Sequence, residues 1–248
     1  NENGDVAFRD SADLPADGSD GVLLAGASFY GGADISPVHP MHFNPSTLAL
    51  DGNGGMAEVE DTGDLNFVNT FTLAGWIKRL ADDGAGVIYL AGTNSDAWYA
   101  GFTPDGRLTI GAGANVWATA STPLTINQWH YVAFTKQGSG AGSVRIWQDG
   151  AQVASGSAGA LAAPSGAKYI GGRPGDAQST WHGMIDELRL HNNALPAAAI
   201  QTLTAGSLCA TDGTSWATAY RWLNCGMYES PGSSEIWIAR GVYIPGIL

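Results

Sequence analysis

Apolar and polar residues alternate in short runs through the middle of the chain, and turn residues separate the runs. Alternation over four to eight residues is typical of a strand with one buried face. The runs with this pattern are residues 48–50, 56–60, 71–78, 87–90, 98–102, 107–110, 129–135, 144–148, 151–154, 168–171 and 181–190. Asp149-Gly150 lies between two of them. It predicts a hairpin with a type I′ turn, because both central positions of that turn need positive φ.

One segment has helical character, residues 196–203, where Pro196 comes first and Ala, Ile and Leu follow. About a dozen strands at this spacing predict a two-sheet antiparallel jelly-roll sandwich. The 35 Gly supply the turns that such a fold needs, and the nine Trp supply bulk for its core. The predicted fold class is therefore all-β, a jelly-roll sandwich with one short helix, followed by an irregular or β C-terminal extension.

The character of the sequence changes at two places, which divides the chain into three parts. Residues 1–44 are acidic and rich in turn residues. They are interpreted as a linker, as an edge extension packed on the next domain, or as the tail of a preceding domain. The predicted sandwich occupies residues 45–206. Residues 207–248 are interpreted as the start of a second β domain.

Several segments of the sandwich region match one known family in that family's order. They are Leu50-Asp-Gly52, residues 71–78, 129–133, 144–150 and 169–171, and residues 183–191 with 194–196. Together they resemble a laminin-G-like jelly roll of the concanavalin A-like lectin/glucanase superfamily, over residues 45 to about 204. The resemblance implies the two-sheet fold and an extracellular binding role.

The last forty residues carry a second, shorter resemblance. Residues 213–220 read Gly-Thr-Ser-Trp-Ala-Thr-Ala-Tyr, and residues 235–245 read Glu-Ile-Trp-Ile-Ala-Arg-Gly-Val-Tyr-Ile-Pro. Over about 212–245 the chain resembles the opening of secreted bacterial parallel β-helix proteins. A β-helix needs several stacked rungs to bury a core. The resemblance therefore implies a fragment of a longer, secreted or surface-displayed bacterial protein.

Acidic residues exceed basic ones by 23 to 11, which gives a formal net charge of −12. Partners that are held through a phosphate backbone need a basic surface, so nucleic acid is excluded. The charge fits either a bound divalent cation or plain solubility. A membrane-spanning segment is not expected, because no stretch approaches the roughly 20 apolar residues that cross a bilayer.

Cys209 and Cys225 are the two cysteines of the chain. In an extracellular chain they are expected to form a disulfide. The alternative is a pair of buried free thiols. Two cysteines alone cannot make a four-thiolate zinc site.

The superfamily resemblance also implies a structural calcium ion. The aspartate of the Gly-x-Ile-Asp-Glu strand, here Asp186, is the implied ligand, and carbonyl groups at Asp51 and Gly52 complete the shell. Calcium takes six to eight hard oxygen ligands, many from the backbone. In the alternative interpretation, Asp186 caps a turn or pairs with Arg189, and Asp51 only shapes its hairpin.

Flat aromatic rings suit the apolar faces of sugars, so the nominated binding residues are aromatic with polar neighbours. They are Trp98, Tyr99 and Trp117, together with Asn94, Asp96 and Asn115. The alternative is that these aromatic side chains belong to the core, where most of the nine Trp must lie.

A glycosidase of this superfamily needs two carboxylates on one strand face. Asp186 and Glu187 are adjacent, so on a strand they point to opposite faces. The sequence therefore favours a non-catalytic, extracellular module that binds carbohydrate or a protein partner. The alternatives are a structural or assembly subunit that packs against other chains, and an ancillary domain of a polysaccharide-active enzyme.

Overall fold

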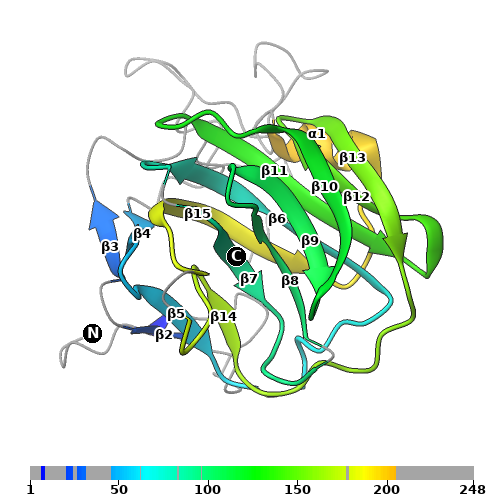
Figure 1. The fold of residues 1–248 in the computed structure, drawn as a ribbon, viewed down its shortest axis with the longest axis horizontal. Helices are drawn as coiled ribbons and strands as arrows, with labels where there is room; N and C mark the ends of the chain where they lie inside the picture. Colours follow the sequence, from blue (N-terminus) through cyan, green and yellow to red (C-terminus); the bar gives the residue numbers. More distant parts are fainter. Residues whose placement is uncertain are drawn as a thin grey trace, which may run out of the picture.

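The computed structural model describes residues 7–8, 21–24, 27–31, 46–61, 63–82, 84–95, 97–176 and 179–204. In these residues the chain forms two antiparallel sheets that lie one over the other (Figure 1). The first, eight-stranded sheet has the order β1 (Ala7–Phe8), β2 (Gly21–Leu24), β5 (Met56–Val59), β14 (Lys168–Ile170), β7 (Gly86–Leu90), β8 (Trp98–Phe102), β9 (Arg107–Ala112) and β10 (Asn115–Pro123). The second, seven-stranded sheet has the order β13 (Ala151–Ala158), β12 (Gly140–Gln148), β11 (Trp129–Gln137), β6 (Thr70–Arg79), β15 (His182–His191), β4 (Ser46–Asp51) and β3 (Ser28–Gly31).

The core lies between the facing sides of the two sheets. Among its fully buried side chains are Phe71, Leu73, Ile77, Ile88, Trp98, Leu108, Phe134, Ile146 and Trp181. Every second residue of a strand points to the same face, so each strand contributes one alternating set to this layer. The predicted all-β sandwich of two antiparallel sheets is confirmed.

The central strand β6 is buried on both faces. Its inward residues Leu73 and Ile77 belong to the main core. Its outward residues Ala74 and Trp76 belong to a second cluster, which the helix α1 (Ala197–Thr204) closes with Ile200. The single short helix expected over residues 196–203 therefore covers the outer face of the second sheet, beside β13 (Figure 1).

The hairpin between β12 and β13 has the predicted turn. Asp149 and Gly150 have φ values of 50° and 80°, the two positive values that a type I′ turn needs. The Asp149 carboxylate also accepts a hydrogen bond from the Tyr131 backbone N–H at 3.0 Å. That contact ties the turn to the neighbouring strand β11.

The two sheets meet along β10 and β13. At Gly156 a Cβ atom would lie 1.7 Å from the Trp117 carbonyl oxygen, so only glycine permits this approach of the two backbones. At the other side, β2 pairs with β5 and β3 pairs with β4, so described strands from residues 1–44 extend both sheets. Cys209, Cys225 and the segment 212–245 lie outside the described residues. Within the part described, no helix is long and apolar enough to cross a membrane.

Candidate functional site

Two of the three nominated aromatic residues are core side chains. Trp98 is fully buried, stacks on Phe71 with ring centroids 4.1 Å apart, and donates its indole N–H to the Phe67 carbonyl at 3.2 Å. Trp117 is 9% exposed and packs in the same core. Both rings are enclosed in the core, which is the alternative that the sequence left open for them. The strand alternation that turns Trp98 inward turns its neighbour outward.

Tyr99 is that outward neighbour, and it is partly exposed on the outer face of the first sheet. It lies opposite Gly111 on β9, and Gly111 lies opposite Val116 on β10. A Cβ at Gly111 would lie only 3.0 Å from the Tyr99 hydroxyl oxygen and 3.1 Å from the Val116 Cα. The missing side chain at Gly111 therefore lets the tyrosine ring lie across β9 toward β10, where Val116 is 58% exposed and Asn115 is exposed.

Arg173 approaches the same ring from the turn that follows β14. Its guanidinium carbon lies 6.0 Å from the Tyr99 ring centroid, at the outer limit of a cation–π contact. Burial raises the pKa of Tyr99, and the positive charge of Arg173 opposes that shift. We call Tyr99, Val116 and Arg173 the Tyr99 surface.

Across the sheet from Tyr99, the next side chains on the same face are buried or already bonded within the protein. Leu90 lies opposite both Tyr99 and Tyr169, and Tyr169 lies opposite Glu58. Tyr169 is only 7% exposed. Burial raises its pKa, and a hydrogen bond to the Glu58 carboxylate raises it further. Tyr169 therefore offers no second aromatic platform, and Glu58 is already bonded within the protein.

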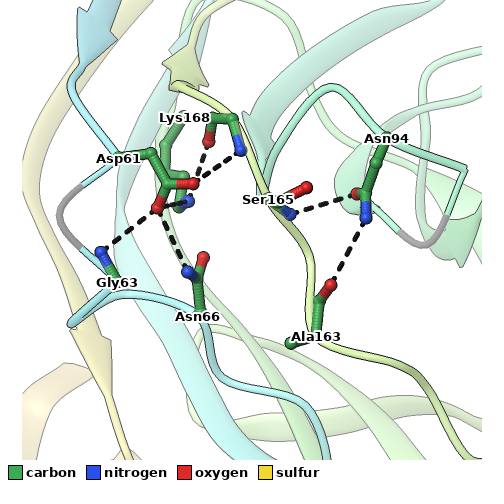
Figure 2. Close-up of polar contacts among 8 residues, drawn as sticks. Asp61, Gly63, Asn66, Asn94, Ala163, Ser165 and Lys168 are labelled. Atoms are coloured by element: carbon green, nitrogen blue, oxygen red, sulfur yellow. Dashed lines mark hydrogen bonds and ion pairs between the residues drawn. The ribbon is translucent and has the colours of Figure 1, made fainter.

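Asn94 holds two loops together at this end of the sandwich. Its Nδ2 donates to the Ala163 carbonyl at 3.3 Å, and its Oδ1 accepts the Ser165 N–H at 3.2 Å (Figure 2). Both ends of the amide are thus used inside the protein. The same loop lies beside the β9–β10 turn, since a Cβ at Gly113 would be 3.8 Å from the Ser95 carbonyl. Asn94 therefore positions the loops next to Asn115, while Asp96 lies outside the described residues.

An ion pair fixes the neighbouring loop. Lys168 donates to the Asp61 carboxylate at 2.9 Å, and Asp61 also accepts the Gly166 N–H at 2.6 Å and the Asn66 amide at 3.1 Å (Figure 2). The hydrogen bond from Lys168, against the opposing effect of burial, lowers the pKa of Asp61 to about 2. Burial, followed by the Asp61 charge, raises the pKa of Tyr89. Asp61 and Lys168 are therefore bonded within the protein, and they hold the segment before β14 in place.

The structure does not bring together the nominated calcium ligands. Asp51 lies opposite His182, four positions before Asp186 on β15, so the two aspartates are separated by about 13 Å of strand. Calcium bonds its oxygen ligands at about 2.4 Å, so one ion cannot reach both. Asp186 accepts the Glu187 N–H at 2.9 Å where β15 bulges. Asp51 accepts the Asn53 and Gly55 N–H groups.

The other nominated ligand, the Gly52 carbonyl, accepts a hydrogen bond from Thr180 at 3.1 Å. The hydrogen bonds of Asp51 fit the alternative in which it only shapes its hairpin. Asp186 instead bonds the next N–H where β15 bulges, and Arg189 pairs with Glu187. In the described part of the chain, no group of three His, Cys, Asp or Glu side chains is placed to hold a metal ion. Calcium binding by this chain stays a prediction.

Arg173 and Val116 were missed by sequence reasoning. Arg173 is followed by Pro174-Gly175, which reads only as a turn. Its position over a ring 74 residues earlier depends on the pairing of β14 with β7 and of β7 with β8. No local signal in the sequence indicates that contact.

Two facing antiparallel sheets with a rim of ordered loops define a lectin-like jelly-roll domain. The chain belongs to the concanavalin A-like lectin/glucanases superfamily, since the Laminin_G_3 family model of that description matches residues 51–201. No curated protein matches the sequence.

Several solved structures share the fold. Domain 4 of AbnA, an extracellular arabinanase from Geobacillus stearothermophilus in complex with arabinotriose, has a TM-score of 0.54 and 17% identity, over 76% of this chain and 93% of that one. The binding domain of Paraclostridial Mosquitocidal Protein 1 has a TM-score of 0.61 and 15% identity, over 84% of this chain. The botulinum neurotoxin serotype C1 binding domain has a TM-score of 0.52 and 15% identity, over 81% of this chain. This chain spans about half of each of the two toxin domains, 52% and 51%.

Proposed function

We propose that this chain is a non-catalytic, extracellular module that binds carbohydrate through the Tyr99 surface. The observation that carries the proposal is the Tyr99 ring, the one nominated aromatic that is partly exposed rather than enclosed in the core. An amphipathic ring of this kind gives a sugar an apolar face and a hydroxyl at its edge. Arg173 beside it supplies N–H groups that hydrogen-bond to sugar hydroxyls.

The comparisons support a binding role through the fold. One domain that shares it was solved with arabinotriose and belongs to an extracellular arabinanase, and two others are toxin binding domains. In that arabinanase the similar domain is one of several. We propose the same arrangement here, with this module carried by a larger secreted protein. Because these identities are low, the location of the site rests on Tyr99 and its neighbours alone.

Isothermal titration calorimetry against arabino-, xylo-, manno- and gluco-oligosaccharides tests the proposal. We expect one class to bind, and Tyr99→Ala to weaken its affinity about ten-fold, because a buried aromatic contact of about 1 kcal/mol or more is lost. Ile126→Ala is the control, since Ile126 is a 40% exposed apolar residue on a loop outside the Tyr99 surface. Equal affinity of the wild type and Tyr99→Ala for the same sugar, or no binding by any class, contradicts the proposal.

A further inference from the structure

Arg173 differs from three of the other four described arginines, each of which pairs with a carboxylate. Arg79 pairs with Asp82, Arg107 with Asp105 and Arg189 with Glu187. Arg173 has no ion pair with any described residue. Arg145, on β12, likewise has no ion pair with a described residue, but it lies on the other sheet, away from Tyr99.

The Arg173 side chain is partly exposed. Its Nε is enclosed and has no hydrogen-bond partner within the described ranges. Nη1 and Nη2 have no hydrogen-bond partner among the described residues, and the residue as a whole is partly exposed. A guanidinium that presents both terminal nitrogens donates two parallel hydrogen bonds to a carboxylate, a geometry that an amine cannot reproduce.

From these observations we propose that the Tyr99 surface selects an oligosaccharide that bears a carboxylate, with the sugar ring on Tyr99 and the carboxylate on Arg173. This inference rests on the proposed function, and it adds the chemical class of the ligand. The two groups are already adjacent, with the guanidinium carbon 6.0 Å from the ring centroid. A uronic acid carries its carboxylate directly on the pyranose ring, so one residue of that kind reaches both groups.

The charge around the site limits how acidic the ligand is. The chain has a formal net charge of −12, and Glu58 and Asp176 lie on the strands and turns that flank Arg173. A densely charged polyanion brings many negative charges into this field and is repelled, whereas a ligand with a single carboxylate brings only the one charge that Arg173 neutralises. The expected ligand is therefore a largely neutral oligosaccharide with one uronic acid residue.

Matched pairs of sugars test the inference by calorimetry in 0.15 M salt. The probes are xylo-oligosaccharides with and without one glucuronic acid branch, galactobiose with and without oxidation of one residue to galacturonic acid, and a heparin tetrasaccharide. We expect the singly acidic member of a pair to bind about ten-fold more tightly than its neutral partner. Heparin is expected to bind more weakly than that member.

Arg173→Met is expected to remove this preference, so that both members of the pair bind with the affinity of the neutral sugar. Arg173→Lys restores only part of it, because an ammonium lacks the paired donors. Arg145→Met is the matched control, since it removes the same charge from a strand of the other sheet. A melting temperature equal to that of the wild type shows that each variant is folded.

Equal affinity for the neutral and acidic members, or a preference that persists in Arg173→Met, overturns the inference and leaves carbohydrate binding at Tyr99 intact. Tightest binding to heparin also overturns it, because a polyanion site would then be present. If the wild type binds none of these sugars, the proposed function is overturned as well.

Discussion

The ammonium nitrogen of Lys168 lies 2.9 Å from the carboxylate of Asp61, although 107 positions separate the two residues in the chain. Lys168 is the first residue of β14, in the interior of the first sheet, and its side chain is 1% exposed, against 23% for Asp61. The pair joins the segment after β5 to the start of β14. It thereby holds the start of β14 in place, and Arg173, which contacts the Tyr99 ring, lies in the turn after that strand.

Asp61→Asn is expected to lower the free energy of unfolding by about 3 kcal/mol, because it leaves the Lys168 charge buried without a counter-charge. Urea denaturation monitored by tryptophan fluorescence measures the loss. Glu60→Gln, at an exposed neighbouring position, is the control and is expected to change the stability by less than about 0.5 kcal/mol. The double variant Asp61→Asn/Lys168→Met is expected to recover part of the loss. No difference between Asp61→Asn and Glu60→Gln contradicts a structural role for the pair.

The same pair predicts how stability responds to acid. The pKa of Asp61 is lowered from 3.8 to about 2 in the folded state, so the ionised carboxylate stabilises the fold at every pH above about 4. That contribution disappears as the pH falls from about 4 to about 2, because the folded carboxylate is then protonated. Unfolding free energies measured at intervals between pH 5 and pH 2 should fall more steeply for the wild type than for Asp61→Asn. Parallel curves would show that Asp61 is not the group responsible.

The closure of the sandwich at β10 and β13 gives a third prediction. Gly156→Ala places a Cβ 1.7 Å from the Trp117 carbonyl oxygen, a backbone atom that cannot move without parting the two strands. We expect a loss of about 3 kcal/mol in unfolding free energy, as for an overpacked core. Gly159→Ala is the control, since a Cβ there meets nothing within 4 Å. Equal stability of the two variants would mean that the sheets are not in contact at Gly156.

The sequence predicted the sandwich because its evidence is local: alternating runs, Asp-Gly turns and one short helical segment. The β12–β13 hairpin is an example, where Asp149-Gly150 alone determined the turn type. The site depended on information that is not local. Alternation places Trp98 and Tyr99 on opposite faces of β8, but both residues are aromatic, so the pattern does not say which one enters the core.

Strand register is also non-local information. Asp51 and Asp186 were nominated as calcium ligands from the superfamily resemblance, whereas the antiparallel pairing of β4 with β15, with His182 opposite Asp51, separates them along the strand. The contact between Arg173 and Tyr99 likewise depends on the strand order β14-β7-β8 in the first sheet. A single sequence specifies each strand more clearly than the order in which the strands meet.

The opposite orientations of Trp98 and Tyr99 make a prediction that separates core from surface within one dipeptide. Trp98→Ala removes a fully buried ring that stacks on Phe71, and we expect it to lower the unfolding free energy by about 4 kcal/mol. Tyr99→Ala removes a partly exposed ring, so its loss is expected to be about 1 kcal/mol, within the ordinary range for a single substitution. Chemical denaturation measures both.

Sugar affinity, measured on the folded fraction of each variant, should show the reverse order. Tyr99→Ala weakens binding, while the more conservative Trp98→Phe, which keeps an aromatic ring in the core, leaves it unchanged. Binding that is lost in Trp98→Phe and retained in Tyr99→Ala would place the ligand elsewhere. The ring on the outer face is expected to contribute to binding and the ring on the inner face to stability, because a ligand reaches only the side chain that the strand turns toward solvent.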